Sequence, residues 1–270
     1  HIEAVLRPMT ETQFNLFSGG VTSERRTQPD SEISCILPAE LDNDALLAAI
    51  MVAGLADGPS LIAEAARREM PAAVPVLEKL CFRFAGFGTD LVVPEQAAAL
   101  QALAAIGGQE AASSVSRLIV KTAVQGSTLK VAVNVAAQLG SNLPGDMVHQ
   151  LLDHADPEVR ADACRCARAA PDTIFILISL LEDLNRGVNV AAACALGRMG
   201  DRDALPALSR MLREAPSAEI IDAISGVANE DSIILLGRLL QTESTLSGAV
   251  RDALDALDHP RAAQIIGNAG

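Results

Sequence analysis

The sequence feature that most constrains the fold is a repeat of roughly thirty residues, which continues from about residue 94 to the end of the chain. Six short segments align: LAAIG, AAQLG, CARAA, LGRMG, ISGVA and LDALD. Their fourth residues follow one another at intervals of 33, 30, 30, 28 and 30, and are Ile106, Leu139, Ala169, Met199, Val227 and Leu257. A period of this length predicts stacked helical pairs, because one pair cannot bury its apolar face alone and must pack on its neighbours.

The composition favours an all-α fold. Half of the 270 residues are apolar, yet only six are Phe, and Trp and Tyr are absent. The apolar content is therefore mostly Ala, Leu, Val and Ile. Ala and Leu lead the scale of helix propensity, and small Ala side chains let two packed helices approach closely. We therefore expect close-packed helices rather than a core built on aromatic side chains.

Proline and capping residues divide the chain into helices. Five prolines each precede a helical apolar pattern, where the missing N–H is tolerated, and they are Pro59, Pro71, Pro94, Pro157 and Pro216. The segment DPEVR at 156–160 has an Asp N-cap, then Pro and an early Glu. Gly200 is expected to close one helix, and Asp201 or Asp203 to cap the next. No proline falls inside a predicted helix, where it would cost about 3 kcal/mol.

These signals predict two regions. Residues 1–41 contain FSGGVTSERRTQPDSE and are expected to form an irregular N-terminal segment. Residues 42–270 are expected to form a single domain, a right-handed α-solenoid of about seven stacked helical pairs, with regular repeats from about residue 94. A chain that begins with His1 is expected to be a fragment or a processed product.

Two segments of the repeat resemble a known family. LGRMGDRDALPALSRML, with the preceding DPEVRADA unit, resembles HEAT repeats of the short bacterial type called PBS-lyase-like. The resemblance covers residues 94–266 well and 42–90 loosely, although CARAAPDTIFILISLL lacks the turn glycines and VANEDSIILLGRLL has Ala-Asn in place of Gly-Asp. It implies a non-catalytic scaffold or adaptor that holds a partner protein or peptide on the concave face. The alternative that it leaves open is an accessory lyase or ligand-binding protein of the same type.

Charge excludes some classes of partner. The formal net charge is −13 and the pI about 4.7, whereas nucleic-acid binding needs dense Lys and Arg. No apolar run approaches the roughly 20 residues that a membrane span needs. The first ten residues, HIEAVLRPMT, do not have the pattern of a signal peptide. We therefore expect no nucleic-acid partner, no membrane span and a cytoplasmic location.

The five cysteines predict a reduced protein without a thiol site. They are Cys35, Cys81, Cys164, Cys166 and Cys194, and their spacing forms no paired motif. Cys164 and Cys166 would point in nearly opposite directions on a helix. Cys164 and Cys194 occupy the same repeat position, which suggests that both fill a tight slot between helices.

The sequence offers one weak candidate for a metal site and no motif for catalysis. In HQLLDHADPE, His149 and Asp153 would share a helical face, with His154 beside them, and such side chains can bind zinc. The alternative is that they make ordinary helix-end contacts. No histidine is followed by Glu, which argues against a di-iron site, and no P-loop, GxSxG or CxxC is present. We expect no cofactor and, on balance, no enzyme.

One repeat position in the second helices is mostly basic. It holds a set that we call the ridge, namely Lys79, Arg117, Gln150, Arg210 and Arg238, with Leu180 at the equivalent place between Gln150 and Arg210. The resemblance implies that second helices line the concave side, so the ridge is a candidate surface for an acidic partner segment. The alternative is that each basic side chain is solvated or pairs with a nearby carboxylate. The sequence does not predict the oligomeric state.

Overall fold

The structure is a computed structural model that describes residues 37–54, 57–88 and 91–268. All of its described helices lie in one contact unit, Leu37–Gly270. The described residues form α-helices and short 3-10 helices without strands, which confirms the predicted all-α fold. Most of the predicted segment 1–41 lies outside the described residues. Within its last part, Pro38–Glu40 forms a 3-10 helix.

The helices form seven pairs after an initial helix, α1 (Asn43–Val52). The first helices of the pairs are α2 (Gly58–Arg67), α4 (Pro94–Ile106), α6 (Gly126–Gln138), α8 (Pro157–Cys166), α10 (Arg186–Arg198), α12 (Ala218–Ser225) and α14 (Ser247–Ala256). The second helices are α3 (Val74–Arg83), α5 (Gly108–Val120), α7 (Gly145–Leu152), α9 (Pro171–Leu180), α11 (Leu205–Glu214), α13 (Glu230–Thr242) and α15 (Pro260–Asn268). The predicted number of pairs, about seven, is confirmed for the described part of the chain.

Several helices begin where the sequence indicates. Asp42 and Asp156 cap α1 and α8 by accepting hydrogen bonds from Ala45 N and Glu158 N, both at 2.8 Å. Asp201 accepts from Asp203 N at 2.9 Å and starts the 3-10 turn Arg202–Ala204 before α11. Gly200 ends α10 with φ of 76°, a left-handed conformation that glycine adopts without a steric penalty.

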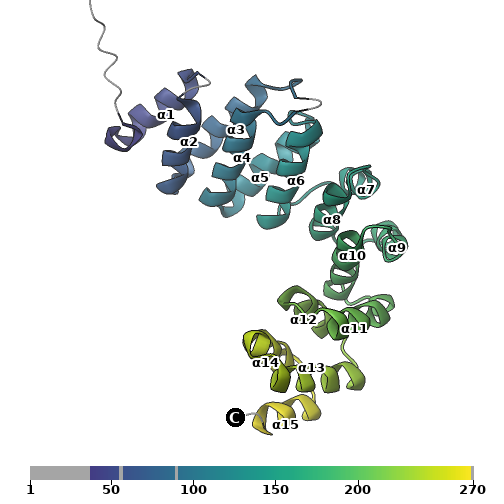
Figure 1. Cartoon of the computed structure of the whole chain (residues 1–270). Coiled ribbons are helices and arrows are strands. Elements are labelled where there is room, and N and C mark those ends of the chain that lie inside the picture. Colours follow the sequence, from purple (N-terminus) through teal and green to yellow (C-terminus); the bar gives the residue numbers. More distant parts are fainter. Residues whose placement is uncertain (1–36, 55–56, 89–90, 269–270) are drawn as a thin grey trace, which may run out of the picture. The chain divides into compact units, whose positions relative to one another are not determined.

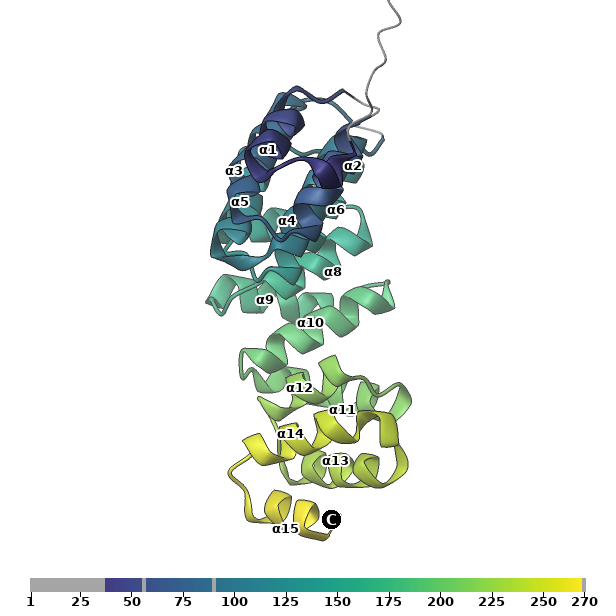
Figure 2. The same cartoon turned by 90° about the vertical axis from the view of Figure 1, so that its left-hand side faces the viewer.

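The helices lie in two rows with one apolar core between them. Successive first helices contact one another from α2 to α14, and we call them the first-helix row. The second helices form the other row, and Figure 1 shows α8, α10 and α12 on one side with α7, α9 and α11 on the other. Figure 2 shows the pairs succeeding one another along the chain. The core continues from Leu46 to Ala262 and is rich in Ala, as the composition predicted.

The long connection between α3 and α4 is anchored by buried polar side chains. Gln96, fully buried on α4, donates from Nε2 to the carbonyl oxygens of Cys81 and Ala123, each at 2.9 Å. Thr128 Oγ1 on α6 accepts from Val93 N at 3.0 Å. Gln96 thus ties the end of α3 to the α5–α6 connection, and the bond to Val93 N holds the end of the α3–α4 connection against α6.

Candidate partner-binding surfaces

The five ridge residues are all exposed on second helices. Lys79 lies on α3, Arg117 on α5, Gln150 on α7, Arg210 on α11 and Arg238 on α13. The five residues therefore lie on equivalent helices, as the repeat predicted. Within the described residues, Lys79, Arg210 and Arg238 make no side-chain ion pair.

Arg117 differs from the other basic ridge residues because it is already paired. Its Nε donates to Glu78 Oε1 at 2.7 Å, and its Nη2 binds the other oxygen of the same carboxylate. This two-point contact lowers the pKa of Glu78 and raises that of Arg117. Arg117 thus links α5 to α3, as the alternative interpretation of the ridge predicted for such residues.

The side of the stack where successive pairs come closest is formed by first helices around α10. Arg165 on α8 donates from Nε to Glu219 Oε1 on α12 at 3.2 Å, although α10 lies between these two helices. The stretch AAACALG at 191–197 of α10 is buried and mostly small. A Cβ on Gly197 would lie 2.5 Å from the carbonyl oxygen of Ala223 on α12. Small side chains therefore let α8, α10 and α12 pack tightly.

The two rows differ in how closely their successive helices pack. Contacts between successive second helices are sparser than those between first helices. The first-helix row is therefore the more closely packed side at α8, α10 and α12, and the ridge lies on the opposite row.

The candidate metal residues do not converge. His149 Nε2 lies 2.9 Å from Thr173 Oγ1 on α9, while His154 Nδ1 accepts from Asp156 N at 3.0 Å. Asp153 ends α7. Among the residues that the structure describes, no three His, Cys, Asp or Glu side chains gather in a way that could hold a metal ion.

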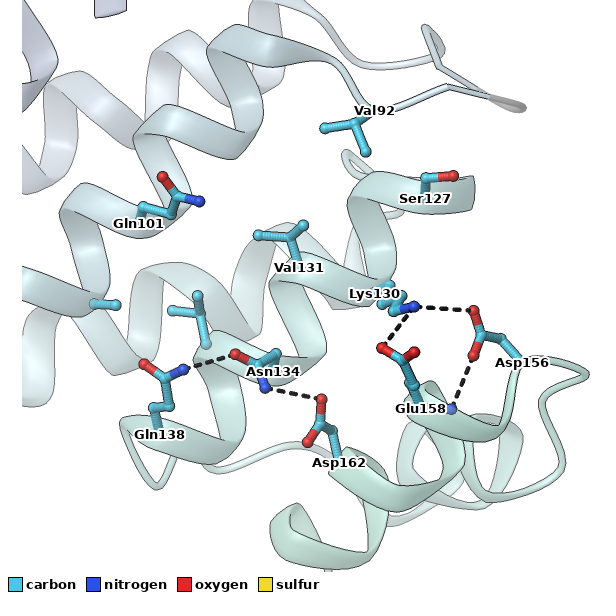
Figure 3. A pocket seen from close by; sticks show the side chains of 12 residues that line it. Val92, Gln101, Ser127, Lys130, Val131, Asn134, Gln138, Asp156, Glu158 and Asp162 are labelled. Carbon is cyan, nitrogen blue, oxygen red and sulfur yellow. Dashed lines mark hydrogen bonds and ion pairs between the residues drawn. The ribbon is translucent and has the colours of Figure 1, made fainter. Parts of the chain in front are cut away.

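A groove lies on the first-helix row. It has a volume of about 660 Å³ and is formed by α4, α6, the start of α8 and the residue Val92. Figure 3 shows its lining, which consists of Val92, Gln101, Ala104, Ser127, Lys130, Val131, Asn134, Val135, Gln138, Asp156, Glu158 and Asp162. The groove thus combines apolar side chains with amides and charged groups from three successive pairs.

The polar side chains of the groove form two clusters. At one end, Lys130 Nζ lies 2.6 Å from Glu158 Oε2 and 3.8 Å from Asp156 Oδ2, and the hydrogen bond with Glu158 raises the pKa of Lys130. At the other end, Gln138 donates to Asn134 at 2.6 Å, and Asn134 donates to Asp162 at 3.1 Å (Figure 3). Asp162 also accepts from Arg165 at 2.7 Å.

This groove was not predicted from the sequence, although the sequence contains one signal for it. Gln101 and Asn134 occupy the same repeat position, five residues before the aligned Ile106 and Leu139. Two amides at one position of successive first helices indicate a polar strip on that row.

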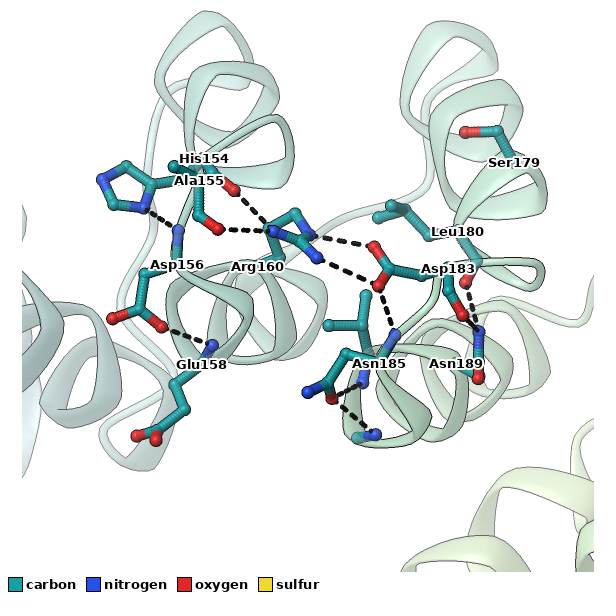
Figure 4. A network of polar contacts seen from close by, with 12 residues as sticks. His154, Ala155, Asp156, Glu158, Arg160, Ser179, Leu180, Asp183, Asn185 and Asn189 are labelled. Carbon is teal, nitrogen blue, oxygen red and sulfur yellow. Dashed lines mark hydrogen bonds and ion pairs between the residues drawn. The ribbon is translucent and has the colours of Figure 1, made fainter.

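A polar network behind the groove fixes the turns of two neighbouring pairs. Arg160 on α8 donates from Nη1 to the carbonyl oxygens of His154 and Ala155, at 2.8 and 3.0 Å. Its Nε and Nη2 donate to Asp183 at 2.9 and 3.0 Å (Figure 4). Asp183 also accepts from Asn185 N at 2.8 Å. This network holds the Asp156 turn, and with it one end of the groove, against the α9–α10 connection.

The described cysteines serve packing. Cys81, Cys164, Cys166 and Cys194 are buried free thiols, and burial raises the pKa of each to about 12. Such thiols stay protonated and are poor nucleophiles. Cys164 and Cys194 are fully buried, as their shared repeat position predicted. Cys35 lies outside the described residues.

Comparison with known proteins supports the repeat assignment. The family model of HEAT repeats matches residues 145–225. Among solved structures, the chain resembles the YibA protein of Escherichia coli with a TM-score of 0.44 and 15% sequence identity, over 82% of this chain and 94% of that chain. No curated protein sequence matches the chain. None of the described helices has the length and apolar character to cross a membrane. Residues 145–225 are therefore identified as HEAT repeats, and the helices before and after them form pairs in the same order.

Proposed function

We propose that this chain is a non-catalytic scaffold or adaptor that binds a partner protein or peptide. The observation that carries the proposal is the groove of about 660 Å³ across α4, α6 and α8. Its charged side chains are engaged with one another, as Lys130 is with Glu158 and Asp162 with Asn134 and Arg165. Such a surface suits recognition, in which shape and fixed charges select a partner.

The ridge is a second candidate surface for the same function. Lys79, Arg210 and Arg238 are exposed cations, and they make no ion pair with any residue that the structure describes. The full chain has a formal net charge of −13. Their chemistry suits an acidic partner segment. The proposal includes a location in the bacterial cytoplasm, because buried free thiols suit a reducing compartment.

Affinity capture with quantitative mass spectrometry from the native host tests the proposal. The wild type is compared with Gln101→Trp, which fills the groove from an exposed position, and with the double variant Arg210→Glu, Arg238→Glu. Matched controls are Gln109→Trp on α5 and the double variant Arg202→Glu, Arg213→Glu, which make the same changes at exposed positions elsewhere. Circular dichroism first confirms that all variants fold.

We expect a partner that the wild type and both controls retain and that one of the two surface variants loses. Loss with Gln101→Trp assigns the partner to the groove, and loss with the double Arg variant assigns it to the ridge. If no protein is enriched by the wild type over the empty resin, the scaffold proposal is wrong.

A further inference from the structure

The groove has a negative charge excess at its Lys130 end. Asp156 and Glu158 contribute two carboxylates there, and Lys130 is the one cation among the lining residues. Asp162, the third carboxylate of the lining, is neutralised by Arg165. One negative charge therefore remains uncompensated at this end, in a protein whose overall charge is also negative.

The carboxylates at this end retain room for a further donor. The Glu158 side chain is 68% exposed, and that of Asp156 is 37% exposed. A carboxylate offers about four acceptor positions on two oxygens. Asp156 uses one oxygen to cap α8, and among the residues that the structure describes its other oxygen has only the 3.8 Å contact with Lys130. A guanidinium or ammonium group from a ligand can therefore bind beside Lys130.

The rest of the groove suits a peptide backbone. Gln101 is exposed and makes no side-chain hydrogen bond to any described residue, so both its donor and its acceptor face the groove unused. A primary amide can pair with the N–H and the C=O of an extended chain. Val131 lies between Gln101 and the charged end (Figure 3), and Val92 also lines the groove, so both can contact apolar side chains of the peptide.

We propose that this groove binds an extended peptide segment with basic side chains, which places a Lys or Arg against Asp156 and Glu158. The inference rests on the proposed scaffold function and names the partner chemistry for one of its two surfaces. The peptide expected in the groove is positively charged, whereas the segment expected on the ridge is negatively charged, so the two surfaces select different segments.

Fluorescence anisotropy with defined peptides tests the inference on the whole chain. The probe is a short fluorescein-labelled peptide of alternating Val and Arg, and its counterpart has Gln in place of every Arg. The groove variant is Asp156→Asn with Glu158→Gln, which removes both charges but keeps an amide that can cap α8. The matched control is Asp172→Asn with Glu182→Gln, two exposed carboxylates at the ends of α9.

We expect the Arg peptide to bind the wild type and the control variant equally, and the groove variant about tenfold more weakly, because two charge-assisted contacts are lost. The Gln peptide should bind the wild type about tenfold more weakly than the Arg peptide. Unlabelled spermidine should not displace the Arg peptide at equal charge concentration.

Three outcomes would overturn the inference: no binding of the Arg peptide by the wild type, equal binding by the groove and control variants, or displacement by spermidine as effective as by unlabelled Arg peptide. The last would mean that only charge is recognised. The scaffold proposal has its own test, since a partner enriched in the capture experiment would stand even if the Arg peptide fails to bind.

Discussion

Arg165 of α8 reaches Glu219 of α12 across the intervening α10, with 3.2 Å between Nε and Oε1. Arg198 at the end of α10 lies 3.8 Å from the same carboxylate. This cluster shows how closely three successive first helices approach. Two features can hold the helices at this distance, the ion pairs themselves and the small residues packed beneath them.

The ion pairs are expected to contribute little. The Arg165 and Glu219 side chains are 38% and 35% exposed, and partly solvated pairs of this kind are worth about 0–1 kcal/mol. We expect Glu219→Gln to lower the free energy of unfolding by less than about 1 kcal/mol, as measured by urea unfolding. A loss of several kcal/mol would show instead that the charges hold α8 and α12 together.

The small residues of α10 are expected to matter more. Gly197→Ala places a Cβ 2.5 Å from the Ala223 carbonyl oxygen and 2.8 Å from Leu208, so α10 and α12 must move apart. We expect a loss of about 2–3 kcal/mol, at the upper end of the range for an overpacked core. Thermal and urea unfolding followed by circular dichroism measure it.

Gly248→Ala in α14 is the matched control for this substitution. No atom lies within 4 Å of its new Cβ, and helical Ala is favoured over Gly by roughly 0.5–1 kcal/mol. The control should therefore be neutral or slightly stabilising. Equal effects of the two substitutions would contradict the close approach of α10 and α12.

The Arg160–Asp183 pair is expected to stabilise the turns behind the groove. The two side chains are only 18% and 9% exposed, and Asp183 accepts three hydrogen bonds. Asp183→Asn keeps the shape but removes the charge that pairs with Arg160. At neutral pH we expect a loss of roughly 2–3 kcal/mol, because the guanidinium stays buried without its counter-ion. Urea unfolding, with Asp172→Asn as the exposed control, measures it.

The same pair predicts a pH dependence. The hydrogen bonds from Arg160 hold the pKa of Asp183 below its ordinary value. A carboxyl whose folded pKa is lowered contributes stability that is complete above the unfolded pKa of about 3.9 and disappears as the pH falls through the folded value. The difference between wild type and Asp183→Asn should therefore be constant from pH 7 to about pH 5 and shrink below about pH 4. A constant difference down to pH 2 would contradict this assignment.

The buried thiols are expected to be inert in the folded protein. With a pKa of about 12, only about one thiol in ten thousand is ionised at pH 8. A thiol reagent with peptide mapping should leave Cys81, Cys164, Cys166 and Cys194 unlabelled in the native state and label all four in urea. Rapid native labelling of Cys164 or Cys194 would show that the helices around α8 and α10 open.

Much of the fold was predictable because its signals are local. The N-caps at Asp42 and Asp156, the turn at Gly200 and the absence of proline from helix interiors all depend on residues within one or two turns of each other. The buried positions of the second helices, such as Leu208 and Leu236, followed from helical periodicity. The repeat then indicated which positions are equivalent, which placed the ridge residues on equivalent exposed faces.

The sequence by itself determined the helices, their pairing and the exposure of the ridge, whereas only the tertiary structure decided which row packs more closely and where a groove opens. Equivalence between repeats says nothing about the distance between helices, which depends on the volumes packed between them. Ala, Cys and Gly in α10 bring Arg165 to Glu219, and neighbouring helices bring Gln101, Asn134 and Glu158 around one hollow. These residues come from different repeats, so their approach follows from packing and not from any local pattern.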